Sequence, residues 1–102
     1  MTKLERELLI KARERIARGA DQFVCIALMN ASSGSGPQER AVTRLCGYIC
    51  SQIGPAFTLD TWARRQKLHS LEGVPYKVRK AVRLAWIGWM LGSDKFPGVA
   101  WQ

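Results

Sequence analysis

The sequence predicts an all-α fold, a compact bundle of four to five helices in a single domain spanning residues 1–102. Apolar residues recur at helical spacing in several separate segments, and residues typical of helix starts and ends flank those segments. An alternating polar and apolar pattern, which would indicate strands, is absent, and so is any internal repeat. A chain of this length buries roughly 65% of the surface that its unfolded form exposes, so a real core is expected.

The first helix is predicted over residues 3–18. Thr2 followed by Glu5 three residues later forms a capping box, and Gly19 provides a stop signal. Between them lies a stripe of apolar residues at helical spacing: Leu4, Leu8, Leu9, Ala12 and Ile16. The basic residues of this helix alternate with glutamates, which predicts a solvated, ion-paired outer face.

A second helix is expected over residues 22–31, with Asp21 as its N-cap. The unbroken apolar run of residues 23–29 fits a buried strand equally well by pattern alone. Helix is favoured by three good helix formers within the run: Ala27, Leu28 and Met29.

A flexible connector is predicted at residues 31–37, because serine and glycine dominate it. It is not a phosphate loop, since the required Lys-Ser/Thr ending is absent. Pro37 suits the first turn of a third helix, which Gly54–Pro55 would end. The apolar stripe expected on that helix comprises Val42, Leu45, Cys46, Ile49 and Ile53.

The C-terminal half holds two more predicted helices. Thr58 would cap a short one that ends near Gln66, and Pro75 would open the last helix, which Gly92 would close. The irregular tail of residues 93–102 carries aromatic residues and is expected to pack back on the bundle.

The last helix changes character along its length. One arc of it, predicted to face the core, contains Val78, Ala81, Val82, Ala85 and Trp89. The cations of its first half lie opposite this arc and are expected to be exposed. Its second half is apolar all round because of Trp86, Ile87, Met90 and Leu91. The sequence therefore predicts that the tail, a second copy of the protein or a different partner covers this hydrophobic contact site.

The strongest compositional signal is a net charge of +8, which is concentrated in one region. Residues 62–83 contain a single acid, Glu72, and seven basic residues: Arg64, Arg65, Lys67, Lys77, Arg79, Lys80 and Arg83. Such a patch would bind the phosphates of a nucleic acid or an acidic protein surface, or it would be a solvated face without a ligand. A helix-turn-helix signature is not evident around it.

Enzyme activity is not expected from this set of residues. His69 is the lone histidine, and no pair of acids is spaced for general acid–base chemistry. The cysteines, Cys25, Cys46 and Cys50, are odd in number and are interpreted as reduced core residues. No catalytic residue, metal site or cofactor is therefore predicted.

A cytoplasmic location without a membrane association is predicted. The N-terminal residues lack the separate hydrophobic region of a secretory signal. The longest apolar runs are much shorter than the roughly 20 residues that a membrane-spanning helix needs.

Three stretches of the chain, residues 6–31, 57–66 and 83–91, resemble small uncharacterised proteins encoded by bacteriophages and prophages. The resemblance lies in the spacing of Leu, Phe, Cys and Trp and includes no catalytic motif. It implies a compact accessory protein that binds and blocks a host component.

The function expected from the sequence is macromolecular binding without catalysis. The resemblance implies a phage-type inhibitor of a host or CRISPR-like defence complex, whose partner would be a host protein or ribonucleoprotein. The alternative is a nucleic-acid-binding accessory or regulatory protein that uses the basic residues of segment 64–83. Homodimerisation through the last helix is a further hypothesis.

Overall fold

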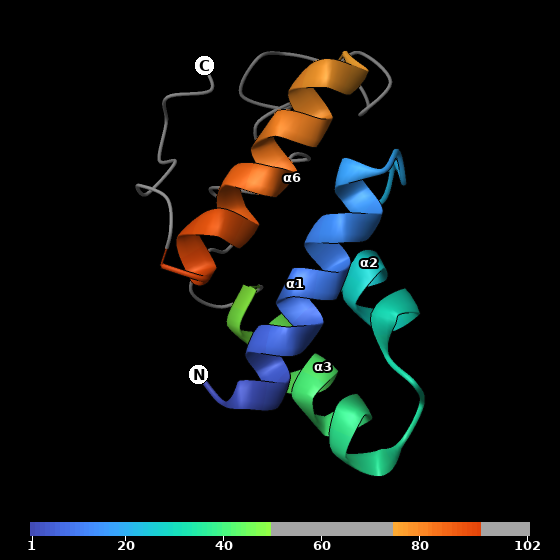
Figure 1. Cartoon of the computed structure of the whole chain (residues 1–102), viewed down its shortest axis with the longest axis vertical. Coiled ribbons are helices and arrows are strands. Elements are labelled where there is room, and N and C mark those ends of the chain that lie inside the picture. The colour runs from blue at the N-terminus through green and yellow to red at the C-terminus, as the bar shows by residue number, and fades with distance from the viewer. Residues whose placement is uncertain (50–74, 93–102) are drawn as a thin grey trace.

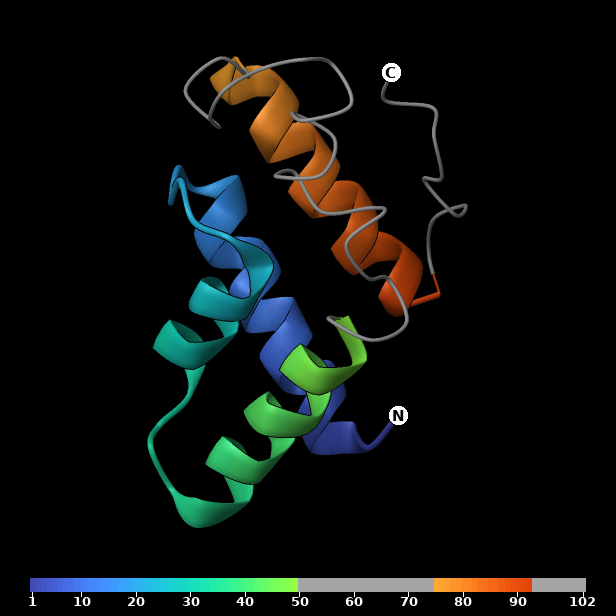
Figure 2. The ribbon, with the colours of Figure 1, turned by 180° about the vertical axis from the view of Figure 1, so that it is seen from behind.

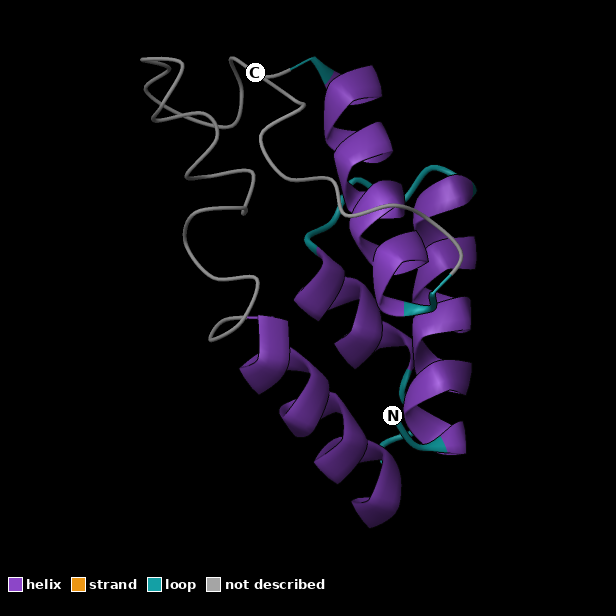
Figure 3. Ribbon diagram, turned by 90° about the vertical axis from the view of Figure 1, so that its left-hand side faces the viewer, coloured by secondary structure: helices purple, strands orange, loops and turns teal. Residues whose placement is uncertain are grey.

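The computed structural model describes residues 1–49 and 75–92, and these residues form four α-helices with no strand among them (Figures 1 and 3). The helices are α1 (Lys3–Ala17), α2 (Val24–Ala31), α3 (Gly36–Tyr48) and α6 (Tyr76–Met90). This confirms the all-α class for the described part of the chain, including a helix rather than a strand after Gln22. The predicted short helix at 58–66 and the tail of residues 93–102 lie outside the described residues.

Local capping residues set the two ends of α1. The backbone N–H of Glu5 donates to Thr2 Oγ1 at 3.1 Å, so the predicted start is confirmed. At the other end Gly19 adopts a φ of +116°, and two bonds close the helix: Gly19 N–H to the Ile16 carbonyl at 3.1 Å and Ala20 N–H to the Arg15 carbonyl at 3.0 Å. These bonds form a Schellman motif, which fixes the direction of the chain as it leaves α1.

Asp21 does not cap α2, contrary to the prediction from sequence. The N-cap of α2 is Phe23, which makes no side-chain capping bond. The Asp21 carboxylate instead pairs with arginines of α6, which attract it more strongly than neutral backbone N–H groups would.

The connector between α2 and α3 is shorter than the predicted 31–37. Ala31 still belongs to α2, and Gly36 already belongs to α3, whose N-cap is Ser35. Side-chain oxygens bind the backbone of this segment: Ser33 N–H donates to Gln38 Oε1 at 2.7 Å, and Gln38 N–H donates to Ser35 Oγ at 3.4 Å. These bonds give the serine-rich connector a defined turn into α3.

Helix α1 lies between α6 on one side and α2 on the other (Figure 1). Seen from behind, α3 lies beside the N-terminal half of α1 (Figure 2). The two helices α1 and α6 run antiparallel, so Arg6 Nη1 near the start of α1 donates to the Leu91 carbonyl at the end of α6 at 3.0 Å. All four helices contribute to one core of buried residues: Leu8, Leu9, Ala12, Ile16, Ala27, Leu28, Ala41, Val42, Leu45, Ile87 and Leu91.

Candidate functional site

The basic half of α6 contains four cations that were predicted from sequence to be exposed. In the structure these cations differ in how deeply they are buried. Lys77 is exposed, and Arg79 and Lys80 are half-buried. Arg83 is buried, with 5% of its surface exposed, so its predicted exposure is wrong. A buried guanidinium needs a paired acid and hydrogen bonds, and the reason for the burial of Arg83 therefore lies in its partner.

That partner is Asp21, which binds two arginines at once. Its Oδ2 accepts from Arg79 Nη2 at 2.6 Å, and its Oδ1 accepts from Arg79 Nε at 3.1 Å and from Arg83 Nη1 at 2.6 Å. The Arg83 guanidinium also lies over the Phe23 ring, 5.2 Å from its centroid. We call this set of residues the Asp21 clamp: Asp21, Phe23, Arg79 and Arg83.

The clamp shifts the pKa values of Asp21 and Arg79. The hydrogen bonds from Arg79 and Arg83, in that order of size, lower the pKa of Asp21 from 3.8 to about 2. The hydrogen bond to Asp21 in turn raises the pKa of Arg79. The carboxylate is therefore ionised throughout the physiological pH range, and its one negative charge offsets one of the two positive charges of Arg79 and Arg83.

Among the described residues, two buried side-chain atoms have no hydrogen-bond partner, one of them in the clamp and the other in the residue after Asp21. They are Arg83 Nε and Gln22 Oε1. An unsatisfied buried donor costs about 1–3 kcal/mol. Within the described part of the chain, the bond to Asp21 and the contact with the Phe23 ring offset this cost for Arg83.

The apolar half of α6 is covered by the same chain. Ile87 and Leu91 belong to the core that contains Leu8 and Leu9 of α1. Trp86 is also buried and packs with Val82, while Met90 is half-buried. Of the four residues predicted to form a hydrophobic contact site, three are therefore core residues in this arrangement.

The predicted core arc of α6 is wrong in part. Ala81 is exposed, whereas the buried residues of this helix are Val82, Arg83, Trp86, Ile87 and Gly88. Ile87 and Leu91 do share a face with Arg83, as their spacing of four and eight residues predicts, but that face contacts α1. The sequence pattern gave the relative positions of these side chains and could not show which face would be covered.

The remaining predicted basic residues, Arg64, Arg65 and Lys67, lie outside the described residues, as do His69 and Cys50. Within residues 1–49 and 75–92, no cluster of three His, Cys, Asp or Glu side chains could hold a metal ion. No helix in this part of the chain is both long and apolar enough to cross a membrane.

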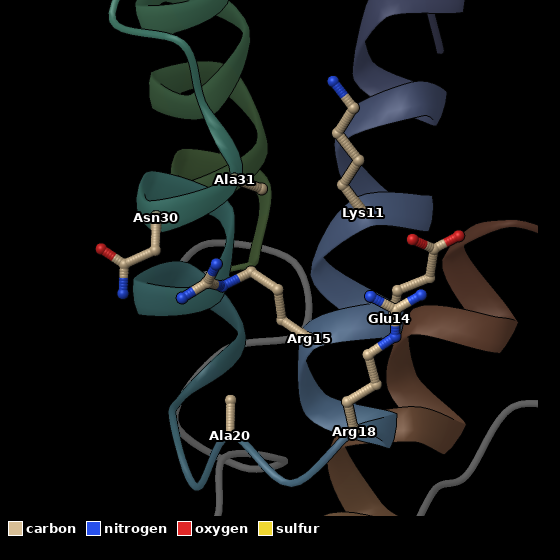
Figure 4. A pocket seen from close by; sticks show the side chains of 7 residues that line it. All are labelled: Lys11, Glu14, Arg15, Arg18, Ala20, Asn30 and Ala31. Atoms are coloured by element: carbon tan, nitrogen blue, oxygen red, sulfur yellow. The ribbon is translucent and has the colours of Figure 1, made fainter.

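A cation-lined cavity of about 450 Å³ lies between α1 and α2 (Figure 4). Its lining consists of Lys11, Glu14, Arg15, Arg18, Ala20, Asn30 and Ala31. In Figure 4 the Arg15 side chain reaches from α1 toward α2. All three cations are exposed, and no ion pair joins any of them to an acid among the described residues.

The sequence pattern does not indicate this cavity, because basic residues that alternate with glutamates along α1 predict an ion-paired face. Lys11, Arg15 and Arg18 are spaced by four and three residues, so they form a stripe on one side of the helix. This spacing is the feature of the sequence from which a basic stripe on α1 could be predicted. The contribution of α2, by contrast, depends on how the two helices pack.

A second cavity of about 410 Å³ lies toward the other end of α1. It is lined by Met1, Glu5, Arg44, Leu45, Tyr48, Trp89 and Met90. Glu5 Oε1 accepts from Arg44 Nε at 3.3 Å, so the polar groups of this cavity already pair with each other. Its apolar residues include Met90, the one half-buried member of the predicted contact site.

No protein-family model matches the chain, and no curated protein or solved structure shows significant similarity to it.

Proposed function

We propose that the protein binds the phosphate backbone of a nucleic acid through a basic surface at one end of the bundle, without catalysing a reaction. This surface is formed by the C-terminal half of α1 and the N-terminal half of α6. The two halves lie at the same end because α1 and α6 run antiparallel and Asp21, just after α1, binds the first half of α6.

The observation that carries the proposal is the excess of unpaired cations at this end. Among the described residues, the acid that forms ion pairs with α6 is Asp21, and two arginines already occupy its carboxylate. Lys77 and Lys80 are not ion-paired to any described acid, and the same holds for the three cations of the α1–α2 cavity. Cations without acid partners attract phosphates, and they do so with a strong dependence on salt.

The test is a salt-titrated binding assay with duplex DNA, single-stranded DNA and RNA. Replacing both Lys77 and Lys80 by Gln is expected to lower affinity and to reduce the slope of log affinity against log salt by about 1.8 for duplex DNA, since each lost phosphate contact removes about 0.9. The matched control is Lys3→Gln, an exposed lysine at the opposite end of α1, which should leave the slope unchanged. Equal effects of the two variants would contradict a localised surface.

A second candidate function is inhibition of a host or defence complex by protein–protein contact, as the resemblance to phage proteins implies. The observation that favours it is a row of exposed apolar side chains, Phe23, Ile26 and Met29, spaced three residues apart along α2. Exposed apolar side chains of this kind are typical anchors for a protein partner.

The two functions predict opposite sensitivities. A protein inhibitor should lose its target when Ile26 and Met29 are replaced by Ser and should tolerate replacement of Lys77 and Lys80 by Gln. A nucleic-acid-binding protein should show the reverse order. Capture assays with both variants, read at two salt concentrations, separate the candidates.

A further inference from the structure

We propose that the cavity between α1 and α2 binds one phosphate group of a nucleotide unit, with Arg15, Arg18 and Lys11 as its ligands. The identity of the ligand rests on the proposed function, but the site itself does not, since a free nucleotide and a nucleic acid carry the same group. The following structural features favour a phosphate.

The first feature is the kind and placement of the cations. A guanidinium presents several N–H donors in a plane and binds phosphate oxygens in pairs, whereas a lysine supplies a compact charge. Arg15 and Arg18 lie three residues apart on α1, and Lys11 lies one turn before Arg15, so all three border the same hollow (Figure 4). None of the three is ion-paired within the described chain, so no described carboxylate has to be displaced by the phosphate.

The second feature is that one segment of the cavity lining is already held in place by bonds of its own. Ala20 lines the cavity, and its N–H is bonded to the Arg15 carbonyl in the Schellman motif at 3.0 Å. The next residue, Asp21, is tied to α6 by the clamp. Ala20 and Asp21 are thus held in place before a ligand binds. This reduces the conformational entropy that is lost on binding.

The third feature is the space and polarity around the cations. Ala20 and Ala31 have small side chains, and the cavity volume of about 450 Å³ falls within the range of ligand sites. Glu14 and Asn30 are the other polar residues in the lining. The Glu14 carboxylate repels a bare phosphate and accepts hydrogen bonds from hydroxyl groups, so it favours a phosphate that carries a sugar over inorganic phosphate.

The test is isothermal titration of the full chain with adenosine monophosphate, inorganic phosphate and adenosine. The monophosphate is expected to bind best, inorganic phosphate more weakly and adenosine not at all. Arg15→Gln should weaken monophosphate binding about tenfold, the loss expected for a paired charged contact, whereas Lys3→Gln should change it less than twofold. Glu14→Gln should strengthen the binding of inorganic phosphate relative to the binding of the monophosphate.

Several outcomes would overturn the phosphate site. One such outcome is that adenosine binds as tightly as its monophosphate. Another is that Arg15→Gln and Lys3→Gln lose equal amounts of affinity for the monophosphate. Arg15 is exposed, so this variant should fold, and its circular dichroism and thermal midpoint should match those of the wild-type protein. Arg18→Gln provides an independent second variant with the same expected result.

Two further arms separate the sources of the phosphate and the two proposals. A 5′-phosphorylated oligonucleotide that binds better than its unphosphorylated form indicates a terminal phosphate, and equal binding of both indicates backbone phosphates. If adenosine monophosphate does not bind, and Arg15→Gln leaves nucleic-acid binding intact while the Lys77 and Lys80 double variant weakens it, the phosphate site is refuted and the proposed function stands. If the monophosphate binds but no nucleic acid does, the phosphate site stands and the proposed function is refuted.

Discussion

Replacing Ile87 by Ala is expected to lower the free energy of unfolding by about 3 kcal/mol. Ile87 is fully buried in the core between α6 and α1, and loss of a buried Ile side chain both forfeits its burial and leaves a cavity. Urea denaturation followed by circular dichroism measures the loss, and the slope with denaturant should stay constant. The control is Met29→Ala on α2, where 55% of the residue is exposed and a change below about 0.5 kcal/mol is expected.

This result matters for any binding study of α6. A variant of Ile87, Trp86 or Leu91 that no longer binds a partner would be explained by loss of the fold, because these residues are buried. If Ile87→Ala instead cost less than about 1 kcal/mol and abolished partner binding, the packing of α6 on α1 described above would be contradicted, and the contact site predicted from sequence would regain support.

The second large effect is expected from Asp21→Asn, which should lower the free energy of unfolding by about 2 kcal/mol. The substitution removes the charge that balances the buried Arg83 guanidinium. Breaking a fully buried pair costs about 3–5 kcal/mol, and the exposure of 44% of the Asp21 side chain reduces that figure through solvent screening. The matched control is Glu7→Gln, an exposed acid on α1 with no ion pair among the described residues, where the change should stay below about 0.5 kcal/mol.

The contribution of Asp21 should also depend on pH, in a direction set by its lowered pKa. The pKa of this carboxyl falls from 3.8 to about 2 on folding, so the unfolded chain takes up the proton first as the pH drops. The stabilisation is fully present above pH 3.8 and is lost as the pH falls through about 2. Unfolding curves of the wild-type protein and Asp21→Asn should therefore converge between those two values. Curves that stayed equally far apart down to pH 2 would show that Asp21 acts through something other than its charge.

Local features of this fold were predictable from sequence because they act over a few residues. The Thr2–Glu5 start of α1 and the glycine stops at Gly19 and Gly92 were all expected and are present in the structure. The buried stripe of α1 was also predicted, because a period of 3.6 residues already determines which side chains share a face. Capping and periodicity need no knowledge of the rest of the chain.

Tertiary structure decided what these faces contact. Asp21 was expected to cap the helix beside it, yet it binds arginines 58 and 62 residues away, and this pairing allows Arg83 to be buried. The same packing turns Ile87 and Leu91 into core residues and brings Asn30 of α2 opposite the cations of α1. The physical reason is that a charge or an apolar face on one helix does not specify its partner, which depends on the distance and orientation that the packed helices allow.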